Sequence, residues 1–296
     1  MSILHAARPD SHLWYTDLMT LEHVDGIAAR EFIDELFART SEYLDTRLAA
    51  DLHRDFPQRL WEMCCAAILL DSGHSLMPTR KRSVAGEGPD ILLADGRTWV
   101  EAIAVNQGTG PDRLEWPDYS STTVVSVPDE PVQLRILSGL AAKRDAGKRY
   151  RERGLIGPSD SYVIALNAGM VPYANRDGSA PRIIQALFSV GHRTVTLSIP
   201  QGEVIGEGFE HRPQVTKSTG SEVGTGMFLT EEARHVSAVL FSAGTLWDFD
   251  SSLLRFYRLV HNPAAETPLA RGWLAGGLEH SVEGDRVVER SPRGAA

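Results

Sequence analysis

Two acidic side chains stand on either side of a predicted turn. Asp90 begins a short apolar run, and Glu101 lies in the next apolar run, beyond Asp95 and Gly96. An Asp-Gly pair between two apolar runs favours a two-residue hairpin, because both turn positions tolerate positive φ. Such a hairpin brings Asp90 and Glu101 together on adjacent strands. Two carboxylates this close share a proton or bind a hard cation such as Mg²⁺.

A third acidic residue stands in an apolar helical pattern further upstream. Glu62 is the only charged residue between Leu60 and Leu70. An ionised glutamate on a buried helix face costs several kcal/mol unless it is paired. We therefore expect Glu62 to meet a basic side chain, the donors of a helix end or a metal. The alternative is a position at the rim of the helix, with the carboxylate in water.

Helices and strands that position these acids follow from periodicity and turn residues. Residues 26–50 form an amphipathic pattern, and a second helix runs from Pro57 to about Leu70. The hairpin covers about 89–105, and a long loop covers 106–130. A helix over 132–153 and a buried strand over 162–166 then suggest a crossover onto the same sheet.

The second half of the chain adds shorter elements. Residues 181–190 have a helical pattern, and 194–199 alternate polar and apolar side chains as a half-buried strand does. Further strands are predicted over 236–241 and 255–260. The segment after Leu278 is polar and charged, which favours a mobile or peripheral tail. The order of elements predicts an α/β fold with a mixed sheet.

Four short motifs together resemble a known nuclease superfamily. They are Trp-Glu at 61–62, Gly-Pro-Asp at 88–90, Trp-x-Glu-Ala at 99–102 and His-Asn-Pro-x-Ala at 261–265, followed by Pro-Leu at 268–269. The hairpin resembles that of the PD-(D/E)XK nuclease superfamily, and the whole set is similar to an uncharacterised bacterial branch over about 30–275. The resemblance implies a restriction-endonuclease-like mixed β-sheet flanked by helices. It divides the chain into an N-terminal helical segment (1–56), a nuclease core (57–278) and a polar tail (279–296).

The superfamily resemblance also assigns roles to side chains, with one departure. Asp90 and Glu101 would bind Mg²⁺, with Mn²⁺ as a substitute, and Glu62 would support the metal or orient its water. Ile103 stands where the superfamily has a lysine. In some branches the following helix supplies that lysine, which makes Lys143 the candidate and Lys148 the reserve. Either lysine is equally well explained as a surface residue whose stem covers apolar area.

Charge and composition restrict the partners. The net charge of −9 argues against a protein that coats nucleic acid by bulk electrostatics. Basic residues nevertheless cluster at 80–82 and over 135–153, where they suit phosphate binding or form a solvated helix surface. The residues expected to contact nucleic acid, with DNA favoured over RNA, are Arg144, Lys148, Arg149 and Arg151.

Other features bear on compartment and on competing sites. No apolar stretch reaches membrane-spanning length, and the first residues lack the apolar core of a signal peptide. Adjacent Cys64 and Cys65 are expected to be buried reduced thiols of a cytoplasmic protein. Cysteine and histidine spacings of a zinc site, a phosphate-binding glycine loop and a serine-hydrolase elbow are absent. A homodimer is left open.

Three functions remain in competition. The favoured one is Mg²⁺-dependent hydrolysis of a phosphodiester in nucleic acid, by a DNA endonuclease. The second is a degenerate nuclease-fold protein that binds nucleic acid or assembles with partners, which Ile103 and the acidic net charge favour. The third is a metal-dependent hydrolase of another phosphate ester. Asn106, Gln107 and His261 either contact substrate or close turns by hydrogen bonds to the backbone.

Overall fold

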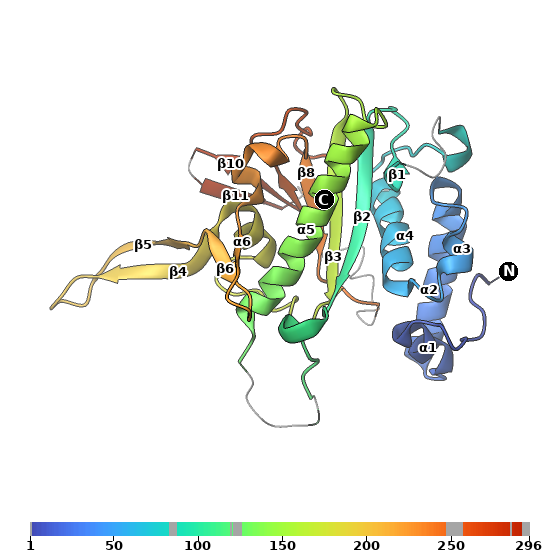
Figure 1. Cartoon of the computed structure of the whole chain (residues 1–296), viewed down its shortest axis with the longest axis horizontal. Helices are drawn as coiled ribbons and strands as arrows, with labels where there is room; N and C mark the ends of the chain where they lie inside the picture. Colours follow the sequence, from blue (N-terminus) through green and yellow to red (C-terminus); the bar gives the residue numbers. More distant parts are fainter. Residues whose placement is uncertain are drawn as a thin grey trace.

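Helices cover both faces of a mixed β-sheet, which confirms the predicted α/β class. The computed structural model describes residues 2–82, 88–118, 120, 126–246, 257–284 and 286–291. Helices of the first 71 residues lie on one side of the sheet, and the long helix α5 crosses the other side (Figure 1). Among the described residues, no helix is both long enough and apolar enough to span a bilayer.

Seven strands form the central sheet in the order β1-β2-β3-β8-β9-β10-β11. Strands β2, β3 and β8 run parallel to one another, and so do β9 and β10, whereas β1, β9 and β11 are antiparallel to β2, β8 and β10 respectively. The bounds are β1 Ile91–Leu92, β2 Thr98–Asn106, β3 Ser161–Met170, β8 Ala238–Ser242, β9 Tyr257–His261, β10 Leu278–Glu283 and β11 Arg286–Arg290.

Two apolar clusters form the core, one on each face of the sheet. On the first face α4 packs against β2 and β3, and the Trp61 indole donates to the Ala165 carbonyl at 2.9 Å. On the second face α5 packs against the same strands. The helices are α1 Leu13–Thr20, α2 Val24–Thr40, α3 Leu48–Asp51, α4 Phe56–Asp71, α5 Asp129–Glu152 and α6 Arg182–Phe188. Short 3₁₀ turns occur at Ser41–Tyr43, Thr79–Lys81, Gly110–Asp112, Met227–Leu229 and Glu231–Ala233.

The acid-bearing hairpin is confirmed, but its turn differs from the predicted one. Strands β1 and β2 pair with Ile91 opposite Val100. The hydrogen-bonded turn runs from the Leu93 carbonyl to the Gly96 amide, and Gly96 alone in this turn has a positive φ, of 71°. Asp95 instead uses its carboxylate to accept the backbone N–H groups of Arg97 and Thr98. The two-residue turn with two positive φ angles was therefore wrong, because the aspartate side chain stabilises a different turn.

In the N-terminal helices the predicted burial of side chains is largely right, but the predicted helix boundaries are not. Helix α4 has Pro57 in its first turn and ends before Gly73, as expected. The helix expected over 26–50 is wrong as a single element, since α2 ends at Thr40, whose hydroxyl donates to the Leu36 carbonyl. Leu44 and Leu48 are nevertheless buried. The periodicity thus reported which side chains are buried, although the backbone passes through a 3₁₀ turn and a short third helix.

Two further expectations for the second half were wrong. The alternating segment forms β4 Val190–Leu197, which pairs with β5 Val204–His211. Val195 and Leu197 are 49% and 52% exposed, because this hairpin projects beyond the sheet (Figure 1). The supposed polar tail contains β10 and β11, whose buried His280 and Ser281 a polarity pattern does not reveal. Strands β6 Gln214–Thr216 and β7 Glu222–Gly224 form a separate pair.

The other strand predictions are confirmed apart from their ends. Helix α6, β8 and β9 correspond to the segments expected over 181–190, 236–241 and 255–260, although residues 255 and 256 lie outside the described residues. Of the expected loop over 106–130, residues 119 and 121–125 lie outside them too. The two cysteines are buried free thiols, as expected.

The β2-α5-β3 crossover is confirmed and brings α5 unusually close to the sheet. Tyr162 on β3 is fully buried, and its hydroxyl donates to the Lys143 carbonyl of α5 at 2.8 Å. The helix approaches this ring at Gly147, where a methyl group would overlap the ring atoms. A glycine here allows the contact that fixes the height of α5 above β3.

We predict that Gly147→Ala lowers the free energy of unfolding by up to about 2 kcal/mol. Alanine favours a helix interior over glycine by about 1 kcal/mol, but the overlap with Tyr162 costs about 1–3 kcal/mol and the buried ring cannot move freely. Urea denaturation measures the difference. Ser138→Ala, at an exposed position of the same helix, is the control and should stay within about 0.5 kcal/mol of the wild type. A more stable Gly147→Ala variant would contradict the close approach.

Candidate functional site

The hairpin brings the two acids of the sequence motif face to face. Extending the register of Ile91 and Val100 by one residue places Asp90 opposite Glu101. Directly opposed side chains on one face of an antiparallel pair lie about 5 Å apart at Cβ. The Asp90 carboxylate is further held by the Ala102 amide, which donates to Oδ2 at 2.7 Å. Asp90 thus lies at the end of β1 and Glu101 within β2.

Helix α5 supplies the cation that the strand lacks. Lys143 Nζ lies 2.6 Å from Glu101 Oε1, and the Tyr150 hydroxyl donates to the same oxygen at 3.4 Å. The Glu101 side chain is only 5% exposed, and that of Lys143 is 20% exposed. The other oxygen, Oε2, is buried and has no hydrogen-bond partner among the described residues. The structure therefore brings Lys143 to the acids, whereas Lys148, the reserve candidate, is exposed on the helix surface.

Glu62 meets a basic side chain of its own helix. Arg59 Nη1 donates to both carboxylate oxygens, at 3.1 and 3.0 Å, and Gln58 donates to Oε1 at 3.0 Å. Arg59 also reaches Asp51 at 3.4 Å. Glu62 is buried, so the alternative of a carboxylate at the rim of the helix is excluded. Because Arg59 occupies both oxygens, Glu62 stands beside the two hairpin acids as a paired carboxylate.

Gln58 links this helix to the hairpin. Its amide nitrogen also donates to the Ala102 carbonyl at 3.2 Å, and its amide oxygen accepts the Ala104 N–H at 2.8 Å. Gln58 and Arg59 were not among the predicted site residues. Their positions four and three residues before Glu62, the spacing at which helical side chains meet, were the signal that would have found them.

Burial makes ionisation of the three acids costly. Desolvation, followed by the charge of Glu101, raises the pKa of Asp90 to about 7. Desolvation, followed by the charge of Asp90, raises the pKa of Glu62 to about 7, although Arg59 opposes this shift. Desolvation also raises the pKa of Glu101 against the opposing charge of Lys143. Perturbed carboxylates in one cluster are typical of functional sites, although structural ion pairs produce them too.

The fit of a metal to this site rests on Asp90 and Glu101. The part of the chain that the structure describes contains no group of three or more His, Cys, Asp or Glu side chains that could hold a metal ion. Mg²⁺ commonly binds proteins through only one or two carboxylates, while water and substrate phosphates complete its coordination. The unsatisfied Glu101 Oε2 is the type of ligand atom that such an ion takes. The two hairpin acids therefore fit Mg²⁺.

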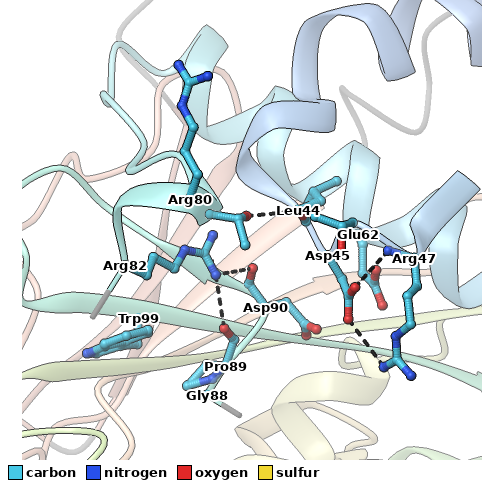
Figure 2. A pocket seen from close by; sticks show the side chains of 12 residues that line it. Leu44, Asp45, Arg47, Glu62, Arg80, Arg82, Gly88, Pro89, Asp90 and Trp99 are labelled. Atoms are coloured by element: carbon cyan, nitrogen blue, oxygen red, sulfur yellow. Dashed lines mark hydrogen bonds and ion pairs between the residues drawn. The ribbon is translucent and has the colours of Figure 1, made fainter. Parts of the chain in front are cut away.

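A cavity of about 540 Å³ opens next to Asp90 and Glu62 (Figure 2). Arg82 crosses its wall and donates to the carbonyls of Asp90, at 2.9 Å, and of Tyr43. The residues that line the cavity are Leu44, Asp45, Thr46, Arg47, Glu62, Thr79, Arg80, Arg82, Gly88, Pro89, Asp90 and Trp99. Arg80 and Arg82, from the basic cluster that the sequence offered for phosphate binding, therefore lie beside the acids, although neither was among the predicted site residues.

The basic residues expected to contact nucleic acid divide into three kinds. Lys148 and Arg149 are exposed on α5. Arg144 pairs with Asp145 at 2.8 Å and with Glu232 at 3.3 Å. Arg151 donates to the carbonyls of residues 157, 158, 160 and 235, so it holds loops together and was wrongly expected to be available to a ligand.

The remaining candidates make structural contacts within the fold. Asn106 accepts the Gly108 amide at 3.0 Å. Asn262 donates to the carbonyls of Ala233 and Val236, at 3.0 and 2.8 Å, while His261 lies 3.4 Å from Glu279. These contacts favour the structural interpretation of both segments over contact with substrate.

Comparisons of this chain with protein-family models, with curated proteins and with solved structures gave no match.

We predict that Asp90→Asn raises the free energy of unfolding at pH 8 by roughly 1–3 kcal/mol and by less than half as much at pH 5. A carboxyl whose folded pKa lies above its unfolded value contributes most stability below pH 4, and this stability is lost as the pH rises towards 7. The amide oxygen of asparagine can still accept the Ala102 N–H. Urea denaturation at the two pH values measures the effect.

The control for this pH dependence is Asp95→Asn in the turn of the same hairpin. Hydrogen bonds from Arg97 and Thr98 lower the pKa of Asp95 although burial opposes them, so its ionised form stabilises the fold above pH 4. This variant should therefore be less stable than the wild type at pH 8. The same sign for both variants would contradict the electrostatics described here.

Proposed function

We propose that this protein hydrolyses phosphodiester bonds of nucleic acid with Mg²⁺, and that its sheet is of the restriction-endonuclease-like type. The observation that carries the proposal is the 2.6 Å contact between Lys143 Nζ and Glu101 Oε1, beside Asp90 on the adjoining strand. The strand has Ile103 at the position where the superfamily has a lysine, and the helix after the hairpin supplies a lysine instead. DNA is the favoured substrate.

The fold supports the proposal through the elements that carry these groups. The two acids come from a β-hairpin at the edge of a mixed sheet, and the lysine comes from the crossover helix between two parallel strands. Glu62 comes from the helix on the opposite face of the sheet. Asp90, at the sheet edge, interacts with both other acids. Its charge raises the pKa of Glu62, and the charge of Glu101 raises the pKa of Asp90.

Each side chain has a defined task in this proposal. Asp90 and Glu101 hold Mg²⁺, for which Mn²⁺ substitutes, and the bound ion lowers the pKa of water and neutralises phosphate charge. Lys143 balances the Glu101 charge in the free protein and places a cation where negative charge develops on the phosphate. Arg59 and Gln58 fix Glu62, and Gln58 also fixes the position of β2 through Ala102 and Ala104.

Exposed basic residues of α5 extend the proposal to the rest of the substrate. Lys148 and Arg149 are placed to neutralise backbone phosphates, and Arg144 joins them if its ion pairs with Asp145 and Glu232 open. The buried free thiols suit the reducing conditions of the cytoplasm.

A second candidate function is binding of nucleic acid without cleavage. The observation in its favour is that Arg59 and Lys143 already neutralise Glu62 and Glu101, and no three-ligand metal group exists among the described residues. A protein of this kind would bind DNA in the presence of EDTA and cut none of it when Mg²⁺ is supplied. Cleavage by the purified wild type excludes this candidate.

We predict that Asp90→Ala, Glu101→Ala and Lys143→Ala each reduce Mg²⁺-dependent DNA cleavage by at least about 100-fold. Loss of either acid removes a metal ligand, and loss of the lysine removes a charge that acts on the transition state. Cleavage of labelled DNA by purified protein measures the rates. Calorimetric titration with Mn²⁺ should show lost binding for the two acid variants only.

Lys217→Ala is the matched control, because this exposed lysine follows β6 and lies outside the hairpin and the basic residues of α5. Its cleavage rate at low salt should change less than tenfold. If DNA is cut by the wild type and cut equally well by Asp90→Ala and Glu101→Ala, the acids are not the catalytic groups. Circular dichroism of each variant establishes that the fold is retained.

A further inference from the structure

The cavity beside Asp90 has walls from five separate parts of the chain. They are residues 44–47 after α2, Glu62 on α4, residues 79–82 in and after a 3₁₀ turn, residues 88–90 before β1, and Trp99 on β2 (Figure 2). Its volume of about 540 Å³ lies in the range of pockets that bind small molecules. Asp90 lines this cavity and Glu101 does not. The cavity is therefore a route by which a phosphate can reach Asp90.

The cavity combines acids near the hairpin with basic groups on its outer parts. Asp90 and Glu62 mark the acidic end, while Arg47 and Arg80 lie on opposite sides of the view in Figure 2. The Arg80 side chain is exposed, and among the described residues it makes no hydrogen bond or ion pair. Arg47, by contrast, pairs with Asp45 at 3.4 Å. Within the described part of the chain, Arg80 is thus the guanidinium at this cavity that has no partner and can bind an anion.

Arg82 gives the cavity a fixed positive charge. Its guanidinium donates to three backbone carbonyls, those of Tyr43, Pro89 and Asp90. Its Nε is buried and has no partner within the described part of the chain. The charge of Arg82 is therefore held beside Asp90 by backbone carbonyls.

The shape of the cavity limits what kind of nucleic acid can reach Asp90. A double helix is far wider than a cavity of this volume, and its bases are stacked inside. A single nucleotide separated from its neighbours suits such a pocket, as it does in enzymes that work on extruded bases. Leu44, Pro89 and Trp99 are themselves buried and turn only their edges to the cavity as apolar surface for a base, and Arg80 provides a partner for a phosphate.

We infer that this cavity binds one unpaired nucleotide of the substrate, with the base against Leu44, Pro89 and Trp99 and a phosphate at Arg80. The inference about binding stands on the cavity alone, and its consequence for cleavage rests on the proposed function. The protein then acts on single strands or frayed ends, and intact duplex is a poor substrate. The nucleotide enters from the face of the sheet that α4 covers, and the remaining strand continues past the hairpin towards α5.

The first test measures binding in EDTA, so that it does not depend on a metal or on catalysis. Calorimetric titration compares deoxyadenosine 5′-monophosphate, deoxyadenosine and inorganic phosphate. The monophosphate should bind at least tenfold more tightly than either fragment, since only it contacts both parts of the cavity. Equal affinity for phosphate and monophosphate, or no binding of the monophosphate, overturns the inference.

Two variants locate the bound nucleotide. Arg80→Ala should weaken monophosphate binding about tenfold or more, the usual effect of losing a charge-assisted hydrogen bond. Thr46→Trp, at an exposed position of the lining, should fill the cavity and abolish binding without disturbing the core. Arg97→Ala, an exposed arginine in the hairpin turn outside the lining, is the matched control and should bind like the wild type. Unchanged binding in both cavity variants overturns the inference.

The second test compares cleavage of one sequence as single strand, as blunt duplex and as duplex with an unpaired end. The single strand and the unpaired end should be cut at least tenfold faster than the blunt duplex, and Thr46→Trp should remove this advantage. Faster cleavage of blunt duplex overturns the inference and leaves the proposed nuclease in place. Nucleotide binding that Arg80→Ala weakens, without cleavage of any DNA, leaves the binding site in place and overturns the proposed function.

Discussion

The buried ion pair between Glu101 and Lys143 is the interaction on which the arrangement of this protein depends. Glu101 lies in a strand of apolar neighbours, and its charge is stable there only because Lys143 Nζ lies 2.6 Å away. This contact requires α5 to lie close above β2 and β3. The glycine at 147 and the bond from the Tyr162 hydroxyl to the Lys143 carbonyl meet that requirement.

Asp90 connects two charged pairs that lie on opposite faces of the sheet. The Glu101 and Lys143 pair belongs to the α5 face, and the Glu62 and Arg59 pair belongs to the α4 face. Only a residue at the end of an edge strand can be near both, because within a sheet the strands separate the two faces. The shortness of β1 is therefore part of the site, and it also leaves the cavity open to Asp90.

The compensation of Glu62 and Glu101 by neighbouring bases bears on both candidate functions. A protein that must hold three carboxylates without a metal needs internal cations for stability, and Arg59 and Lys143 fulfil that need. In the proposed nuclease a metal would contact Glu101 through Oε2, which has no partner among the described residues, while Lys143 keeps its contact with Oε1. Glu62 differs, because its bidentate pair with Arg59 satisfies both oxygens.

Local pattern determined the hairpin, the limits of α4 and α5, the crossover and the pairing of Asp90 with Glu101, because strand alternation and helix periodicity act over a few residues. Periodicity also places Lys143 at the border of the apolar face of α5. Its contact with Glu101, however, depends on how α5 packs on the sheet. Tertiary structure alone decided that Arg59 forms an ion pair with Glu62 and that Arg151 donates to loop carbonyls. It also decided that Arg80 and Arg82 border a cavity. Those outcomes depend on segments far apart in the chain. For the same reason β10 and β11 escaped notice, since their burial comes from neighbouring strands and not from their own apolar content.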